Sequence, residues 1–167
     1  EQLNSLDMNI LLFLPNISEI KVYNNGQEKI YSKEVTPIED YEEISVYSKI
    51  NNNISNKLSY AVKRDENHTI FDKDSKKNKA VNIAVAIPLN NIQDEYFLYN
   101  FFPMRLMKSP FKLLLHASFI SLDQHRDSLN LDTKGYNKQI LEYLLALCVS
   151  FVSSYFSNKK TDYTAFG

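Results

Sequence analysis

Short runs of alternating apolar and polar residues dominate the first half of the chain. Residues 17–23, 44–50 and 57–63 carry apolar side chains at alternate positions, the pattern of a half-buried strand, and residues 28–35 are expected to return as the partner of the first run. Asn24-Asn25-Gly26 and the asparagines at 51–53 separate such runs, and Asn and Gly accept the left-handed backbone of a tight turn. The pattern predicts antiparallel hairpins, with a Pro-containing acidic loop over residues 36–43.

The second half of the chain is more apolar, and residues 80–88, 96–102 and 112–120 predict three further strands. In the first, Val81, Ile83, Val85 and Ile87 share one face, opposite the small residues Ala84 and Ala86. Small residues let another layer approach that face closely. In the third, Leu113, Leu115, Ala117 and Phe119 oppose Leu114 and His116. The polar stretch of residues 64–79 between the two halves predicts an exposed loop.

Two segments have helical periodicity. Apolar residues recur at steps of three and four after Asn137, which predicts a long helix with Asn137 as its N-cap and one broad apolar face. That face is formed by Ile140, Tyr143, Leu144, Leu147, Cys148, Phe151, Val152 and Tyr155. Residues 140–156 contain Glu142 and fall short of the about 20 residues of a membrane span, so we expect a core helix and no membrane. Residues 3–14 predict a short amphipathic helix, with Asp7 as a cap and Pro15 as its stop.

These elements predict the fold class: an α+β domain of two layers, a mostly antiparallel sheet of seven or eight strands with a long C-terminal helix on one face. We expect a single domain over residues 1–157, and a tail over residues 158–167 that could link to a further domain. The first residue is Glu rather than Met, which favours a piece of a longer protein.

Composition narrows the function classes. The 167 residues are 44% hydrophobic and 23% charged, with 19 Lys and Arg against 20 Asp and Glu, so a globally basic nucleic-acid binder is excluded and nucleic acid is an unexpected partner. Cys148 is the single cysteine, which favours an intracellular protein. Three glycines cannot build a glycine-rich phosphate loop. The three histidines have no neighbours at metal-ligand spacing, so we expect no metal site.

One stretch carries candidate chemistry. An aromatic strand leads into residues 104–110, where Arg105 and Lys108 form a short cationic loop between two strands, and His116 follows on the second strand. Arg126 lies in the next turn. Prolines on both sides stiffen the loop, and Arg and Lys suit an anionic group such as a phosphate. The plainer interpretation, which composition alone favours, is that these are solubilising charges and a core histidine.

Two segments resemble a known family. They are NILLFLPNISEI at residues 9–20 and FFPMRLMKSPFKLLLHASFISLDQHRDSLNLD at residues 101–132, the latter followed by the helix at Asn137. Together they resemble the region after the nucleotide-binding domain in GHKL ATPases, especially those with a heat-shock-90-type or sacsin-type ATPase domain. Residues 29–79 have no specific match. The superfamily's Asn/Glu-bearing helix, Asp-x-Gly turn and glycine-rich lid are absent from the sequence.

The resemblance implies a transducer-like middle domain that couples ATP use in a preceding domain to downstream domains. Its implied phosphate-sensing residue is Lys108 or Arg105, with His116 and Arg126 in support, since Arg126 is similar to the arginine that closes the family's strand-turn segment. It implies no cofactor in this chain, and ATP and Mg²⁺ in the longer parent protein. The implied partner is the preceding ATP-binding domain, and the implied location is cytoplasmic; whether the parent protein is a homodimer is left open. The chain alone is then inactive. The alternatives are a protein-interaction or structural domain and a self-contained enzyme.

Overall fold

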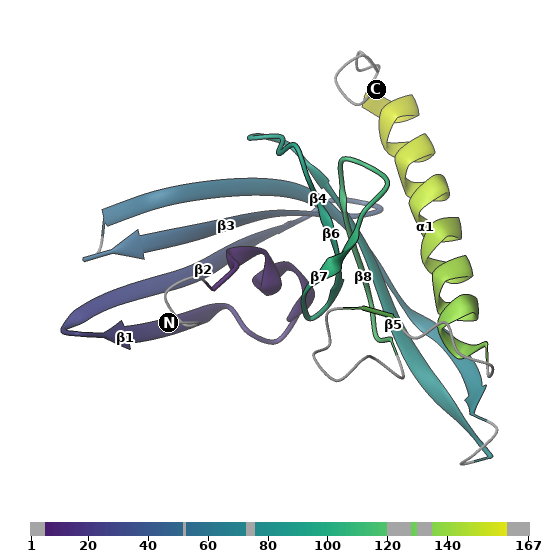
Figure 1. Cartoon of the computed structure of the whole chain (residues 1–167). Helices are drawn as coiled ribbons and strands as arrows, with labels where there is room; N and C mark the ends of the chain where they lie inside the picture. The colour runs from purple at the N-terminus through teal and green to yellow at the C-terminus, as the bar shows by residue number, and fades with distance from the viewer. Residues whose placement is uncertain (1–5, 52, 73–75, 120–127, 130–134, 160–167) are drawn as a thin grey trace.

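The structure is a computed structural model that describes residues 6–51, 53–72, 76–119, 128–129 and 135–159. It has the α+β fold that the pattern predicts: one sheet with a long helix packed on it (Figure 1). The elements are the 3₁₀ helix η2 (Met8–Phe13), β1 (Glu19–Asn24), β2 (Gln27–Pro37), β3 (Glu42–Ile50), β4 (Asn53–Asp72), β5 (Lys77–Pro88), β6 (Phe97–Asn100), β7 (Phe102–Lys108), β8 (Leu114–Ala117) and the helix α1 (Tyr136–Lys159).

The eight strands form one sheet in the order β1-β2-β3-β4-β5-β8-β6-β7. All neighbouring strands are antiparallel except β6 and β8, which run parallel. The first five strands are joined in chain order by hairpins, because each connection is short. Asn25 (φ 47°) and Gly26 (φ 77°) adopt the left-handed backbone at the first turn, and Asn51 (φ 49°) does so at the third, which confirms both asparagine turns.

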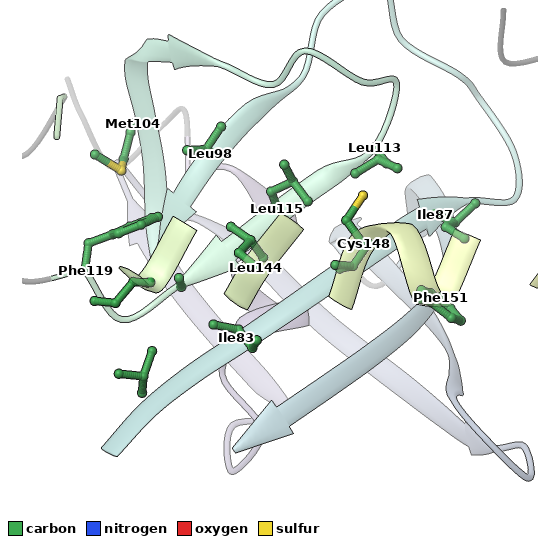
Figure 2. Packing of buried hydrophobic residues seen from close by; sticks show 14 of the residues in the cluster. Ile83, Ile87, Leu98, Met104, Leu113, Leu115, Phe119, Leu144, Cys148 and Phe151 are labelled. Carbon is green, nitrogen blue, oxygen red and sulfur yellow. The ribbon is translucent and has the colours of Figure 1, made fainter. Parts of the chain in front are cut away.

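The two faces of the sheet carry separate hydrophobic cores. On one face, α1 packs across β4, β5 and β8, and Ile83, Leu115 and Leu144 meet beneath it (Figure 2). On the opposite face, η2 packs against the β2 and β3 part of the sheet and reaches Tyr99 of β6 (Figure 1). The predicted division of β5 is confirmed, since its valines and isoleucines belong to the α1 core and Ala84 and Ala86 to the η2 core.

The helical prediction for the C-terminal segment is confirmed in its buried face and wrong at its start. Ile140, Leu144, Cys148, Phe151 and Tyr155 are all buried against the sheet. The helix begins at Tyr136, and Asn137 is a buried residue of its first turn rather than the cap. The carbonyl of Gly135 accepts from the amide of Gln139 at 3.1 Å, so Gly135 is the N-cap, two residues before the predicted one.

The polar stretch of residues 64–79 was predicted as a loop, and this is wrong. It forms the end of β4 and the start of β5, which pair as far as Asp72 and Lys77. The strands continue because the end of β4 contacts the helix side of the molecule. Ile70 is buried in the α1 core, and Asp72 accepts from the Tyr136 hydroxyl at 3.1 Å. Lys79 adds an ion pair to the same carboxylate at 2.6 Å.

Several boundaries also differ from the prediction. The loop at residues 36–43 is shorter, because β2 and β3 pair up to Pro37 and Glu42. At the N-terminus, α-helical periodicity becomes a single 3₁₀ segment, capped by the Asp7 carboxylate accepting from the Asn9 amide at 2.9 Å. The tail was predicted from residue 158, but α1 continues to Lys159. The rest of the predicted tail, residues 160–167, lies outside the described residues, as does the first part of the N-terminal helix.

One finding concerns membranes. Among the described residues, α1 is long and apolar enough to cross a bilayer by length and composition alone, with a mean hydropathy of 1.6 over its most apolar window. A third of that window is buried inside the molecule. In this structure the helix packs on the sheet, as a core helix does.

Candidate functional site

The segment 104–110 was predicted as a cationic loop, but most of it is an edge strand. β7 pairs with β6 on one side only and forms one border of the sheet. Pro103 is tolerated here because an edge strand does not need every backbone N–H for pairing. The two basic residues are therefore presented on a strand, which holds them more rigidly than a loop would.

The two basic residues, Arg105 and Lys108, have different surroundings. Arg105 is exposed in the middle of β7, and no described residue forms an ion pair or hydrogen bond with it. Lys108 lies at the end of β7 and forms an ion pair with Glu95. Both side chains of that pair are more than half exposed, so the pair contributes little to stability and can exchange for another anion.

His116 does not join this group. It lies on β8, 3% exposed, on the η2 face of the sheet, with its ring stacked on Phe13 at 4.7 Å between centroids. Its Nδ1 accepts from the backbone amide of Phe101 at 3.3 Å. Burial lowers the pKa of His116 to about 4, so it is neutral at physiological pH. Arg126, the fourth predicted site residue, lies outside the described residues.

The turn that connects β6 to β7 is strained. Phe101 adopts φ 63°, a left-handed conformation that is an outlier for a bulky side chain. His116 stabilises it twice, through the hydrogen bond to the Phe101 amide and through ring contact at 5.0 Å between centroids. The histidine thus fixes the start of β7 from inside the core, and acts on Arg105 only through the backbone.

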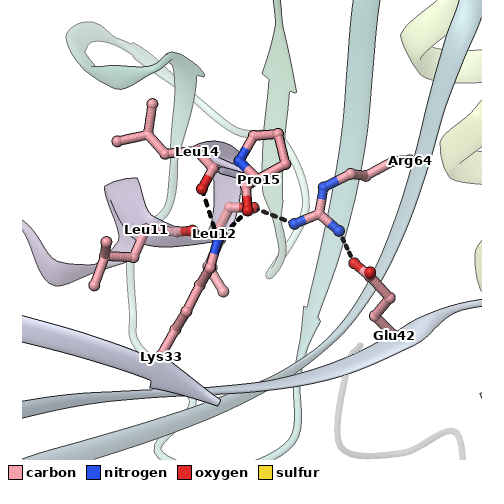
Figure 3. Close-up of polar contacts among 7 residues, drawn as sticks. All are labelled: Leu11, Leu12, Leu14, Pro15, Lys33, Glu42 and Arg64. Carbon is pink, nitrogen blue, oxygen red and sulfur yellow. Dashed lines mark hydrogen bonds and ion pairs between the residues drawn. The ribbon is translucent and has the colours of Figure 1, made fainter. Parts of the chain in front are cut away.

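Sequence reasoning missed a second cationic cluster, in which Lys33 and Arg64 donate hydrogen bonds to carbonyls at the end of η2 (Figure 3). Lys33 of β2 donates to the carbonyls of Leu14 at 2.6 Å, Leu11 at 3.1 Å and Pro15 at 3.3 Å. Arg64 of β4 donates to the Leu12 carbonyl and pairs with Glu42. These cations satisfy carbonyls that the end of a short helix leaves without partners. Desolvation, helped by the charge of Arg64, lowers the pKa of Lys33 to about 8.

A buried polar network holds the other end of η2. The Tyr60 hydroxyl donates to the Asn9 side chain at 2.8 Å, and the Tyr99 hydroxyl donates to the Asp7 carboxylate. Burial raises the pKa of both tyrosines. The alternation Tyr60, Val62, Arg64 along β4 could have placed Arg64 on the η2 face, had the strand been extended past residue 63. All these groups face protein partners, which is typical of a structural network.

Two partly open hollows in the described part of the chain flank α1, on the face of the sheet opposite these groups. The strongly shifted pKa values of Lys33, Tyr60, Tyr99 and His116 belong to groups packed around η2. Within the described residues, no group of three or more His, Cys, Asp or Glu side chains could hold a metal ion.

Comparison with models of protein families, with curated proteins and with solved structures finds no match. The likeness to GHKL ATPases accordingly rests on the two sequence segments alone.

Proposed function

We propose that this chain is the transducer-like domain that follows the ATP-binding domain of a cytoplasmic GHKL-type ATPase. The observation that carries the proposal is the segment of residues 101–132, which resembles the family and contains an exposed cation on a sheet edge. Arg105 has no partner among the described residues and stands where a neighbouring domain can approach it.

The proposed mechanism is electrostatic. A cation held against the terminal phosphate of ATP stabilises the charge that develops during phosphoryl transfer. Because this cation belongs to a second domain, the contact exists only when the two domains close, and ATP occupancy then favours the closed arrangement. ATP and Mg²⁺ bind in the preceding domain, and this chain supplies the contact.

The surroundings of the two basic residues favour Arg105 over Lys108 for this role. Lys108 already has a carboxylate partner in Glu95, whereas Arg105 has none in the part of the chain that the structure describes. Arg105 is also placed by a short strand that begins at the strained Phe101 turn, and strained backbone is concentrated at functional sites. His116 is a positioning residue for that turn.

The test is ATP turnover by the polypeptide extended on its N-terminal side to include the proposed ATP-binding domain. We expect Arg105→Ala to lower kcat at least ten-fold, about 1.4 kcal/mol of transition-state stabilisation, and Lys108→Ala to have a smaller effect. Lys21→Ala, which removes an exposed, ion-paired lysine on the opposite sheet edge, is the control and should leave kcat unchanged. Unchanged turnover in both β7 variants would refute the proposal.

A non-catalytic interaction domain is the second candidate, and β7 is the observation that favours it. Phe102 and Leu106 on this edge strand are 59% and 72% exposed, and an edge strand offers unpaired backbone groups to an incoming strand. In that case Leu106→Asp abolishes partner capture, while Arg105→Ala leaves any ATP turnover of the longer polypeptide unchanged.

A further inference from the structure

The side of α1 that faces away from the sheet is uncharged over most of its length. From Tyr143 to Ser157 the helix contains no Asp, Glu, Lys or Arg. Leu145 and Val149 on this side are 42% and 65% exposed. A helix face exposed to water normally carries charges, so this face has the composition of a contact surface.

The exposed helix is a ridge between two hollows. A groove of about 490 Å³ runs along one side and is mostly apolar; it is lined by Ile87, Pro110, Phe111, Lys112, Leu113, Cys148, Val149, Val152, Ser153 and Phe156. A second groove of about 410 Å³ runs along the other side, between the helix and residues 38–41. Val149 is therefore both a ridge residue and a wall of the first groove.

We infer that a second copy of this chain covers this face, with the two α1 helices antiparallel about a two-fold axis near Val149. A ridge bordered by grooves is self-complementary, because the ridge of each copy can enter the groove of the other. Ala146, Ser150 and Ser153 are exposed on the same side and are small, so the helix axes can approach closely. The inference is independent of whether an ATP-binding domain precedes this chain.

Charge favours this occupant and this orientation. Glu142 is the one exposed acidic side chain of α1, seven residues before Val149. Antiparallel pairing about Val149 sets Glu142 of one copy opposite position 156 of the other. The groove at that position contains Phe156 and has Lys112 as its basic residue. Each copy thus supplies one carboxylate and one ammonium group, and the two-fold axis forms the pair twice.

The contact area predicts a weak affinity. A helix of 24 residues is about 36 Å long and about 10–12 Å in diameter with its side chains, so the helix strip alone covers roughly 400 Å² per copy, and the wall of the apolar groove adds to it. The total is near the lower limit of about 1,000 Å² for a specific interface, so we expect a weak dimer with a dissociation constant of about 1–100 μM.

The test is sedimentation equilibrium of the chain between 1 and about 300 μM, which brackets that constant. We expect a monomer–dimer equilibrium that Val149→Asp abolishes. Far-UV circular dichroism and the Tm, measured well below the dissociation constant where both proteins are monomers, should not change, since Val149 is exposed in the monomer. Glu142→Lys and Lys112→Glu should each weaken the dimer at least ten-fold, and the double variant should restore it to within three-fold. Lys21→Glu, on β1, is the charge-reversal control and should leave the constant unchanged.

Three results would overturn the inference. The first is a monomer at every concentration. The second is a dimer that Val149→Asp leaves intact and Leu106→Asp disrupts, which would assign self-association to the β7 edge. The third is a monomer that sediments with phosphatidylcholine vesicles and loses this binding with Val149→Asp, which would identify a lipid surface as the occupant.

Discussion

At the scale of single residues, His116 is the titratable group whose pKa shift is best explained by its contacts. It is enclosed by Phe13, Phe101 and the Phe101 amide, and it stays neutral because charging it would place an unpaired cation in an apolar core. The surroundings that fix the β6–β7 turn therefore also make the fold sensitive to acid.

The pKa of about 4 for folded His116 leads to a prediction. Unfolded histidine has a pKa of about 6.5, so between pH 6.5 and 4 the unfolded chain binds more protons. Lowering the pH through this window should cost up to about 3 kcal/mol of stability through this residue. Urea denaturation at pH 7 and pH 4 should show that His116→Gln loses less stability than the wild type by about this amount. Equal losses in the two proteins would mean that His116 does not titrate this way.

Lys33 supports a second prediction at this scale. Its ammonium group donates to the carbonyls of Leu11, Leu14 and Pro15 at the end of η2, and the Leu14 carbonyl also accepts from the Ile17 amide at 3.1 Å. We expect Lys33→Met to destabilise the fold by about 1–3 kcal/mol, because three hydrogen bonds from a charged donor are lost. Lys21→Met replaces an exposed lysine that forms an ion pair with Glu19, and should change the free energy of unfolding by less than about 0.5 kcal/mol. Similar effects of the two variants in urea denaturation would show that the hydrogen bonds from Lys33 to the end of η2 do not stabilise the fold.

At the scale of elements, alternation predicted which side chains of β5 and β8 face which core, because period-two burial is a local property. It failed at residues 64–79, where charge density suggested a loop. Those charges are compatible with a strand only because α1, distant in sequence, supplies the Tyr136 hydroxyl and buries Ile70. The candidate site was also predicted only in its local part. The basic residues were found from the sequence, but their place on an edge strand and the separation of His116 depend on the order of strands in the sheet.

The small residues of β5 give a matched pair of variants. Ala86 is fully buried beneath the η2 core, whereas Ala80 on the same strand is exposed. Ala86→Leu should destabilise the domain by about 1–3 kcal/mol, because the added atoms overpack the η2 core in which Ala86 is fully buried. Ala80→Leu should change stability by less than about 0.5 kcal/mol. Thermal unfolding of both variants measures the difference, and a tolerated Ala86→Leu would show that η2 is not closely packed there.

At the scale of the whole molecule, the two cores share one sheet. β5 contributes Ile83 and Val85 to the α1 core and Ala84 and Ala86 to the η2 core, and β8 divides its residues in the same way. A strand cannot leave one core without leaving the other, since adjacent side chains point to opposite faces. The shared strands therefore predict that the two cores unfold together, while the single domain over residues 1–157 stays a prediction of the sequence.

Cooperativity can be tested with two probes and one variant for each core. Far-UV circular dichroism near 222 nm follows α1. Near-UV circular dichroism of tyrosine reports on both cores, because Tyr31, Tyr60, Tyr96 and Tyr99 are buried in the η2 core and Tyr136 and Tyr155 in the α1 core. Leu144→Ala and Leu12→Ala each remove a fully buried side chain, one from each core, and should cost about 2–5 kcal/mol. We expect either variant to shift both probes to the same lower urea midpoint, because both cores lose their shared strands together. If Leu12→Ala split the tyrosine signal into two steps and left the transition at 222 nm in place, the N-terminal strands with η2 would form a separately folding unit, and the single domain over residues 1–157 would have to be divided.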